Sequence, residues 1–459
     1  MGALTFIIYD ESYKIYNIDF TKGFLKMKNK GPDHTSYMIE HSQNINKISK
    51  DLLKMSLSRS ELNDYSMHTF IYKYHRLSIN DPSHDGNQPF EDPIMHMIRR
   101  YPDLKMRPKR KLLCDGVIYN YNHLKEQECF NDKDLQSSCD VEVILPLYIK
   151  YGIEKALNML RGDFSLILTE NTNTFILKEM NVFCARDKYG IRPLHLITNV
   201  SGNFYMFTSD TCSIPSFISN DTVNYNIVEV PPGCYWSLQT KKFTSYTDYT
   251  TLLKELPIVN KTDPETLVNV YKTLKEFISS ACNSRIIYHN DMGILFDDNC
   301  TISSYLLITL VLNELSITNS SFVYHIFFNT YKTSNNHDTF INFLETSFPN
   351  LNVKFHIIHD DNILAYIEEH VYLKVILSSY GLDTIWNDQP IKCTNNHPFG
   401  FEIRYPFLDT DLVHYIKSLD IILKEKRSYK ANTKPIDKYI IRKAFEETRL
   451  LPNDFLWCE

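Results

Sequence analysis

Apolar and polar residues alternate along several short runs in the first half of the chain. The alternation is clearest at Phe164, Leu166 and Leu168, and further apolar runs follow at 175–177 and 181–185. A period of two is typical of a strand with one buried face, and Gly, Asn and Pro separate the runs as turn residues do. Since the chain also opens with an apolar run, we predict antiparallel sheet in this half.

The second half alternates between helix patterns and strand patterns. Asp263 and Pro264 form a helix start, with a cap and then a first-turn proline, and apolar residues recur at helical spacing to Ala281. The predicted elements that follow are strand 292–296, helix 302–315, strand 322–328, helix 337–348, strand 353–358, helix 362–373 and strand 374–378. This alternation predicts a parallel sheet covered on both faces. Ligands bind beyond the carboxyl ends of such strands, so the loops after Phe296 and Ser378 are candidate sites.

Length and composition limit the class of protein. Because 459 residues exceed what one core usually serves, we expect two domains, 1–250 and 262–459, joined by a polar linker. The content of 43% apolar and 23% charged residues is typical of soluble globular proteins. No apolar run is long enough for a membrane helix and the N-terminus lacks a signal-peptide pattern, so we expect a cytoplasmic protein without a membrane partner.

Charge and cysteine usage exclude further classes. The net charge of -6 gives no electrostatic reason to expect nucleic acid as a partner. The chain has 10 cysteines but no Cys-x-x-Cys pair, which argues against a zinc site and against a disulfide framework.

A charged corner follows the run at 181–185. Its charged residues are Arg186, Asp187, Lys188 and Arg192, in a turn that also contains Gly190 and Pro193. Residues 160–168 (Leu-Arg-Gly-Asp-Phe-Ser-Leu-Ile-Leu) and 185–194 (Ala-Arg-Asp-Lys-Tyr-Gly-Ile-Arg-Pro-Leu) together resemble the glutaminase half of class II glutamine amidotransferases. More narrowly, the chain resembles glutamine-dependent asparagine synthetases. An ordinary hairpin with a solvated turn would explain this stretch alone, but further matches occur in the family's order.

The resemblance implies the architecture of both halves. The first is expected to be an αββα glutamine amidotransferase-like domain of the Ntn-hydrolase type. The second is expected to be a doubly wound parallel α/β domain like the ATP-pyrophosphatase (PP-loop) synthetase domains. We expect this second domain to be shortened, because residues 402–409, which resemble the family's Glu-Ala-Arg-Val-Pro-Phe-Leu-Asp, follow soon after Thr384.

The residues that would hydrolyse glutamine are replaced. The family has a cysteine at the position of Gly2, whose thiol attacks the amide while its α-amino group acts as the base. Asp115 stands where an asparagine, together with Gly116, forms the oxyanion hole, so negative charge lies where negative charge must develop. Processing to Thr5 would create another N-terminal nucleophile, but nothing before it indicates processing. We therefore expect no catalytic residue in this half.

The glutamine-binding residues are better matched. Residues 75–79 (His-Arg-Leu-Ser-Ile) resemble the segment whose arginine, here Arg76, pairs with the α-carboxylate of glutamine. The resemblance also assigns Gly116 to the substrate pocket and Asp140 to the α-amino group. Glutamine or asparagine is therefore an expected ligand. The alternative is that Arg76 and Asp140 pair with each other or with neighbours.

The loop after Phe296 does not match the ATP loop of the family. Asparagine synthetases have Ser-Gly-Gly-x-Asp-Ser there, which binds pyrophosphate and Mg²⁺. Here the loop begins with Asp297 and Asp298, and Thr301 replaces the metal aspartate. At a dielectric of ~20, one carboxylate ~4 Å from a phosphate charge costs on the order of 4 kcal/mol. We expect no cofactor, although Asp297 and Asp298 could hold a divalent cation instead of forming a solvated loop.

Parts of a second nucleotide loop remain. Residues 377–384 (Leu-Ser-Ser-Tyr-Gly-Leu-Asp-Thr) resemble the family's Leu-Ser-Gly-Glu-Gly-Ser-Asp-Glu. Ser378, Gly381 and Asp383 persist, as does Lys438 further along the chain, whereas Tyr380 replaces a glutamate that takes part in the aspartate chemistry. These four residues are the expected remnants of the ATP and pyrophosphate region.

Two functions follow as hypotheses. The first is a catalytically degenerate asparagine synthetase homologue, a pseudoenzyme that binds an amino acid or a protein partner. The second is an active glutamine-hydrolysing asparagine synthase with rebuilt sites, which would require ATP, Mg²⁺, aspartate and glutamine.

Overall fold

The chain forms two compact units. The computed structural model describes residues 2–10, 20–41, 68–92, 108–130, 134–171, 180–247, 263–296, 301–318, 321–329, 336–359, 362–391, 398–429 and 433–458. The first unit comprises Met1–Thr247 and Lys392–Gly400, and the second comprises Asp248–Ile391 and Phe401–Glu459. Within the described ranges, no helix has both the length and the hydropathy that crossing a membrane requires.

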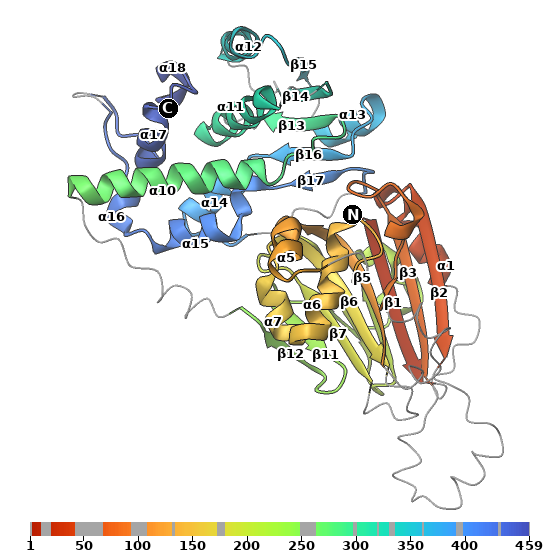
Figure 1. Ribbon diagram of the computed structural model, residues 1–459. Coiled ribbons are helices and arrows are strands. Elements are labelled where there is room, and N and C mark those ends of the chain that lie inside the picture. Colours follow the sequence, from red (N-terminus) through yellow and green to blue (C-terminus); the bar gives the residue numbers. More distant parts are fainter. Residues whose placement is uncertain are drawn as a thin grey trace, which may run out of the picture. The chain divides into compact units, whose positions relative to one another are not determined.

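The first unit contains two six-stranded sheets with antiparallel pairing throughout. Figure 1 shows their strands in red to yellow-green. The first sheet has the order β10 (Tyr225–Glu229), β8 (His195–Asn199), β9 (Phe204–Thr208), β1 (Gly2–Asp10), β3 (His68–Arg76) and β2 (His34–His41). The second has the order β12 (Lys242–Ser245), β11 (Cys234–Ser237), β7 (Asn181–Arg186), β6 (Gly162–Asn171), β5 (Lys109–Ile118) and β4 (Phe90–Glu91).

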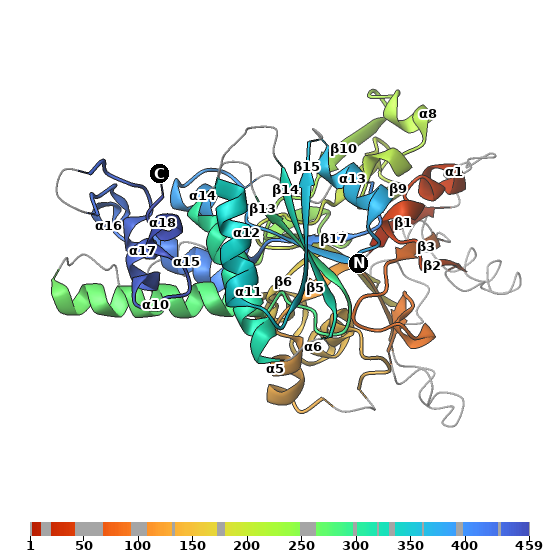
Figure 2. The ribbon, with the colours of Figure 1, turned by 90° about the horizontal axis from the view of Figure 1, so that it is seen from above.

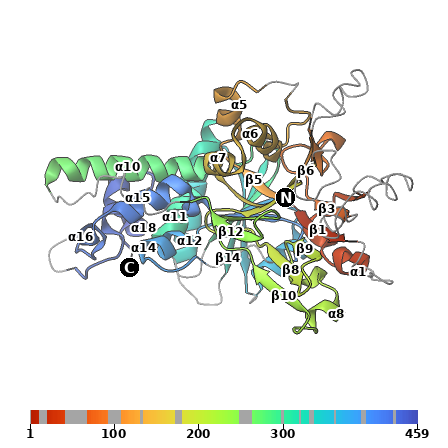
Figure 3. The same ribbon diagram turned by 90° about the horizontal axis from the view of Figure 1, so that it is seen from below.

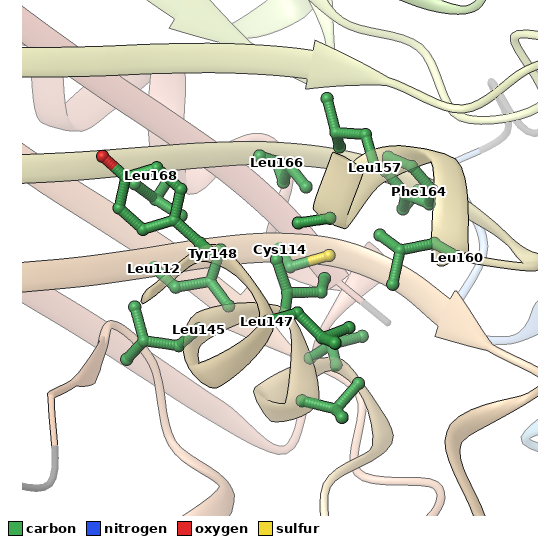
Figure 4. Close-up of a cluster of buried hydrophobic side chains, with 14 of the residues drawn as sticks. Leu112, Cys114, Leu145, Leu147, Tyr148, Leu157, Leu160, Phe164, Leu166 and Leu168 are labelled. Atoms are coloured by element: carbon green, nitrogen blue, oxygen red, sulfur yellow. The ribbon is translucent and has the colours of Figure 1, made fainter. Parts of the chain in front are cut away.

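Helices cover the outer faces of both sheets. Helices α5 (Tyr121–Gln127), α6 (Ile144–Tyr151) and α7 (Ile153–Met159) lie on the second sheet (Figure 3), and α1 (Phe20–Leu25) and α8 (Ser216–Ser219) contribute to the core on the first. Along β6, Leu166 and Leu168 pack against the helices, as Figure 4 shows, whereas Ile167 packs between the sheets. The predicted αββα architecture is confirmed, but β6 is buried on both faces, whereas the period-two pattern predicted one buried face.

The charged corner is an internal structure and not a solvated turn. Asp187 is fully buried, and its carboxylate accepts hydrogen bonds from the backbone N–H groups of Tyr189, Ile191 and Arg192 at 2.9 to 3.0 Å. Burial raises the pKa of Asp187, while these three donors oppose the shift. Arg186 donates to the carbonyl oxygens of Gly190, Arg192 and Val230.

The second unit is built on one five-stranded sheet in which every neighbouring pair is parallel. Its order is β15 (Asn352–Ile358), β14 (Val323–Asn329), β13 (Met292–Phe296), β16 (Val375–Ser378) and β17 (Glu402–Arg404). The chain therefore adds strands on one side of β13 and then on the other, which makes the sheet doubly wound, as predicted.

Helices surround this sheet (Figure 2). They are α10 (Pro264–Asn283), α11 (Ile302–Ile317), α12 (Asn336–Ser347), α13 (Ile363–His370), α14 (Leu382–Trp386), α15 (Thr410–Ser418), α16 (Ile421–Lys424), α17 (Tyr439–Glu446) and α18 (Asn453–Leu456). Asp263 caps α10 by accepting from the N–H of Thr266, as the sequence pattern predicts. Helix α13 ends three residues earlier than predicted, because the β-branched Val371 is extended.

Buried ion pairs fix the edge of this sheet. Arg404 of β17 donates to Glu402 at 2.6 Å and to the carbonyl oxygen of Arg285 at 3.0 Å. Arg285 in turn donates to Asp409 at 2.6 Å. Because all four side chains contribute to one chain of contacts, the segment 402–409 is held to the end of α10.

Asp187 should be essential for the stability of the first unit. Asp187→Ala leaves three buried N–H donors without their acceptor, so we expect the free energy of unfolding to fall by at least about 3 kcal/mol. Asp187→Asn keeps one acceptor oxygen and should lose less. Urea denaturation measures both values. Asp221→Ala is a control, since Asp221 accepts from the N–H of Asn224 at an exposed position; an equal loss in this variant would contradict the prediction.

Candidate functional sites

Gly2 occupies the head of β1, opposite Arg76 of β3. Its N–H donates to Oδ1 of Asp115 at 2.9 Å. A Cβ added to Gly2 would lie 1.6 Å from the carbonyl oxygen of His75, which is far inside van der Waals contact. The position that the resemblance assigns to the nucleophile therefore lacks the space for any side chain.

Asp115 and Gly116 are neighbours in β5, paired with β6. Asp115 is buried, and its carboxylate receives the N–H of Gly2. An ionised carboxylate accepts hydrogen bonds but cannot donate one to an oxyanion. Gly116 lies so close to β6 that a Cβ would be 2.2 Å from the carbonyl oxygen of Asp163. Gly116 is thus required by sheet packing, and Asp115 opposes the chemistry.

Two cysteines precede the predicted site carboxylates, Cys114 before Asp115 and Cys139 before Asp140. Burial raises the pKa of Cys114 well above its usual range and that of Cys139 to about 12. Neighbouring carboxylates, Asp115 for Cys114 and Asp140 for both thiols, add to the shift. Since the thiolate is the nucleophilic form, neither thiol is suited to replace the missing nucleophile at neutral pH.

Arg76 binds the segment that follows β3. Its guanidinium donates to the carbonyl oxygen of Ser83 at 2.6 Å, to Oδ1 of Asn87 at 2.9 Å and to the carbonyl oxygen of Asp81. Gly86 lies against it, because a Cβ there would be 2.1 Å from a guanidinium nitrogen. Only 5% of Arg76 is exposed, so its hydrogen bonds are largely internal.

Asp140 is held from two sides. Oδ1 accepts from the side-chain amide of Asn80 and Oδ2 accepts from the N–H of Ile118, both at 2.6 Å. Asn80 belongs to the same segment that Arg76 binds. Arg76 and Asp140 therefore both contact the segment 80–83. Asp81 also connects this segment to Ser138, because its Oδ2 accepts from the N–H of Ser138. Burial raises the pKa of Asp81, but hydrogen bonds from Ser83 and Ser138 lower this pKa overall.

The second candidate site is a cavity of about 280 Å³ in the second unit. It lies at the carboxyl ends of β13, β14 and β16, where the winding of the sheet reverses and where ligands bind in such folds. Among the described residues, its wall consists of apolar and uncharged polar side chains, namely Leu295, Phe296, Asn329, Ile363, Ser378, Ser379 and Tyr380. The site that strand order predicted is therefore present as a cavity.

Two serines at the start of α11 connect the cavity to a nearby ion pair. Ser304 Oγ lies 3.0 Å from Oγ of Ser379 in the cavity wall. Ser303 Oγ donates to Oδ2 of Asp383 at 3.1 Å. The sequence interpretation did not single out these serines, although two adjacent hydroxyls in the first turn of an otherwise apolar helix were a signal.

Asp383 and Lys438 form an ion pair. The ammonium group of Lys438 contacts Oδ1 of Asp383 and lies 3.5 Å from Oδ2 of Asp437. Gly381, which precedes α14, has a φ of +112°, and a Cβ there would lie 2.7 Å from the side chain of Leu408. The structure thus places all four predicted remnants, Ser378, Gly381, Asp383 and Lys438, around one end of β16.

These residues do not fit Mg-ATP. Both oxygens of Asp383 are engaged, and Thr301, at the start of α11, offers a hydroxyl where the family has a metal aspartate. Asp297 and Asp298, the other candidate cation ligands, lie outside the described residues. In the part of the chain that the structure describes, no three His, Cys, Asp or Glu side chains form a metal-binding group.

Comparisons with known proteins agree with the resemblance. A family model described as a glutamine amidotransferase domain matches residues 61–250, and one described as asparagine synthase matches residues 392–459. A probable glutamine-hydrolysing asparagine synthetase of Acanthamoeba polyphaga mimivirus is 24% identical, covering 99% of this chain and 83% of its own. The asparagine synthetase of Gallus gallus is 24% identical, covering 84% and 75%.

Two further matches cover a shorter stretch or have a lower similarity. The asparagine synthetase of Mesocricetus auratus is 33% identical over 171 residues, which cover 37% of this chain and 26% of its own. The solved structure of the allosteric regulatory enzyme of purine biosynthesis covers 88% of this chain and 80% of its own, with a TM-score of 0.33 and 14% identity. A score this low carries no argument about function.

Introducing the missing thiol should not create glutaminase activity. Gly2→Cys forces a Cβ against the carbonyl oxygen of His75, so we expect a loss of stability of about 1–3 kcal/mol and no ammonia release from glutamine. Gly2→Ala is the matched control, because it carries the same Cβ without the thiol. Ammonia release by Gly2→Cys above the level of Gly2→Ala would contradict this prediction.

Proposed function

The chain is an asparagine synthetase-like protein, and we propose that it is a pseudoenzyme that acts by binding small molecules. The observation that carries the proposal is the packing at the first residue of β1. Gly2 has no space for the side chain of a nucleophile, and its N–H donates to Asp115. The alternative is an active glutamine-hydrolysing asparagine synthase with rebuilt sites. Glutamine hydrolysis by the N-terminal thiol mechanism has no nucleophile at this position, which favours the binding hypothesis.

The cavity of the second unit supports a small uncharged ligand. Its volume of about 280 Å³ is just below the range of about 300–1,000 Å³ that is typical of ligand sites, which limits the ligand to a small molecule. None of the lining residues that the structure describes is charged, so a triphosphate would find no cation among them. Leu295, Phe296 and Ile363 offer apolar surface, while Asn329 and Ser379 offer hydrogen bonds. A planar, uncharged ring ligand such as a nucleoside fits this chemistry, and no metal or nucleotide cofactor is part of the proposal.

Binding of glutamine or asparagine in the first unit is a second candidate. Arg76 and Asp140 converge on residues 80–83, which is consistent with two ends of one small site. Both groups already have internal partners, so an amino acid would have to displace some of these hydrogen bonds. We therefore propose weak binding. A protein partner becomes the remaining hypothesis if neither unit binds a small molecule, and we propose a cytoplasmic location in either case.

A nucleoside should bind the second unit, whereas Mg-ATP should not. Adenosine at a hundred times its dissociation constant would stabilise the protein by about 2.7 kcal/mol, and thermal unfolding measures this shift. Ile363→Trp fills the cavity and should abolish the shift, while Ile421→Trp, at an exposed position, should not.

Two outcomes would count against this assignment. The absence of any shift with adenosine would contradict a ring ligand in the cavity. A shift with Mg-ATP that disappears in Asp383→Ala would show a working nucleotide site and favour the active synthase.

Calorimetry should detect weak amino-acid binding in the first unit. We expect a millimolar dissociation constant for glutamine or asparagine, weakened by at least ~1.5 kcal/mol in Arg76→Ala because a charge-assisted contact to the carboxylate is lost. Arg161→Ala serves as the control in the same unit. Heat of binding that Arg76→Ala leaves unchanged, or no heat at all, would leave Arg76 only its internal role.

A further inference from the structure

Each oxygen of the Asp383 carboxylate has a partner within the protein. Oδ1 contacts the ammonium group of Lys438, and Oδ2 accepts from Ser303 at 3.1 Å. Only 4% of the Lys438 side chain is exposed, so this ammonium is shielded from water and requires partners within the protein. Asp437 provides a second carboxylate oxygen at 3.5 Å.

The backbone directs Lys438 to this position. Lys438 has a φ of 53° and a ψ of 36°, the left-handed conformation that residues other than glycine rarely adopt. Its N–H donates to Oδ1 of Asp437 at 3.0 Å, and its carbonyl oxygen accepts from Ile441 and Arg442 at the start of α17. Arg442 also donates to the carbonyl oxygens of Asp437 and Leu456. A strained conformation persists only where its surroundings determine it, and such conformations concentrate at functional sites.

A divalent cation would compete with this arrangement. Mg²⁺ requires oxygen ligands at about 2.0–2.1 Å with near-octahedral geometry, and both oxygens of Asp383 already have partners. A metal ion on Asp383 would also stand beside the ammonium of Lys438. At a dielectric of ~20, two unit charges of one sign ~4 Å apart reduce affinity by about three decades, and the partial exposure of Asp383 reduces that effect.

We propose that Lys438 is the built-in counter-cation of Asp383, so that the second unit holds its ligand without a divalent metal ion. The inference rests on the proposed function, because it concerns the same cavity: Ser303 and Ser304 join Asp383 to the cavity wall at Ser379. It goes further by assigning to Lys438 the positive charge that a metal ion bound by Asp383 would otherwise supply.

The test is a titration of the full-length protein with MnCl₂ alone, followed by electron paramagnetic resonance and thermal unfolding. Lys438→Met removes the ammonium and frees Asp383 for a metal, so we expect Mn²⁺ to bind at least about tenfold more tightly than in the wild type. The gain should disappear in the double variant Lys438→Met with Asp383→Asn. Lys443→Met is the matched control, since Lys443 pairs with Glu446 on the same helix and does not contact Asp383.

The outcomes separate clearly. A gain of Mn²⁺ affinity in Lys438→Met that depends on Asp383 supports the proposal, and a folded Lys438→Met variant without any gain overturns it. If Lys438→Met does not fold, the comparison of the wild type with Asp383→Asn decides. Equal Mn²⁺ titrations of the two proteins support the proposal. If the wild type binds Mn²⁺ and Asp383→Asn abolishes this binding, the proposal is overturned. No cavity ligand is used, so failure of adenosine to bind would contradict the proposed function without affecting this result.

Discussion

The first unit depends on the buried carboxylate of Asp187. Two chain crossings between the two sheets pass this residue, since residues 187–194 lead from β7 to β8 and residues 230–233 lead from β10 to β11, whereas a third crossing leads from β3 to β4. The side chain of Asp187 binds three N–H groups of the first crossing, and its carbonyl oxygen accepts from the N–H of Gly233 in the second at 2.9 Å. The neighbouring Arg186 donates to carbonyl oxygens of both crossings. Because a buried charge is tolerated only with several partners, the two residues fix these two crossings to each other.

In both units, polar groups at the candidate sites form hydrogen bonds or ion pairs with other groups of the protein. Arg76 donates to the backbone that follows its own strand, Asp115 accepts from Gly2, and Asp383 contacts Lys438. An unpaired buried polar group costs about 1–3 kcal/mol, so a site without a ligand is more stable when its groups find internal partners. These internal partners therefore satisfy the polar groups of the candidate sites without a ligand. The cavity beside Ser379 differs, because the part of its wall formed by Leu295, Phe296 and Ile363 is apolar and incurs no such cost.

The sequence predicts regular structure well where periodicity determines it. Strand 292–296 has the bounds that the pattern predicts, and the parallel order follows from the alternation of strands with helices. The same logic locates the cavity, since strand order alone indicates the carboxyl ends of β13 and β16 as a site. Sequence could not reveal that Gly2 has no space for a Cβ, or that Asp383 pairs with Lys438. Those facts depend on close approaches of Gly2 to His75 and of Asp383 to Lys438, residues far apart in the sequence, which propensity and spacing do not encode.

The ion pair in the second unit is asymmetric in its exposure to water. The side chain of Asp383 is 44% exposed, whereas that of Lys438 is 4% exposed. Water can therefore solvate the carboxylate without the lysine, but the ammonium has no comparable substitute for its carboxylates, so the burial of Lys438 is the reason that the pair must persist. With Asp437, the group carries two negative charges and one positive charge. An anion that approaches from solvent meets the exposed carboxylate before the buried ammonium, and a lysine in a nucleotide-type fold consequently does not make this site attractive to phosphate.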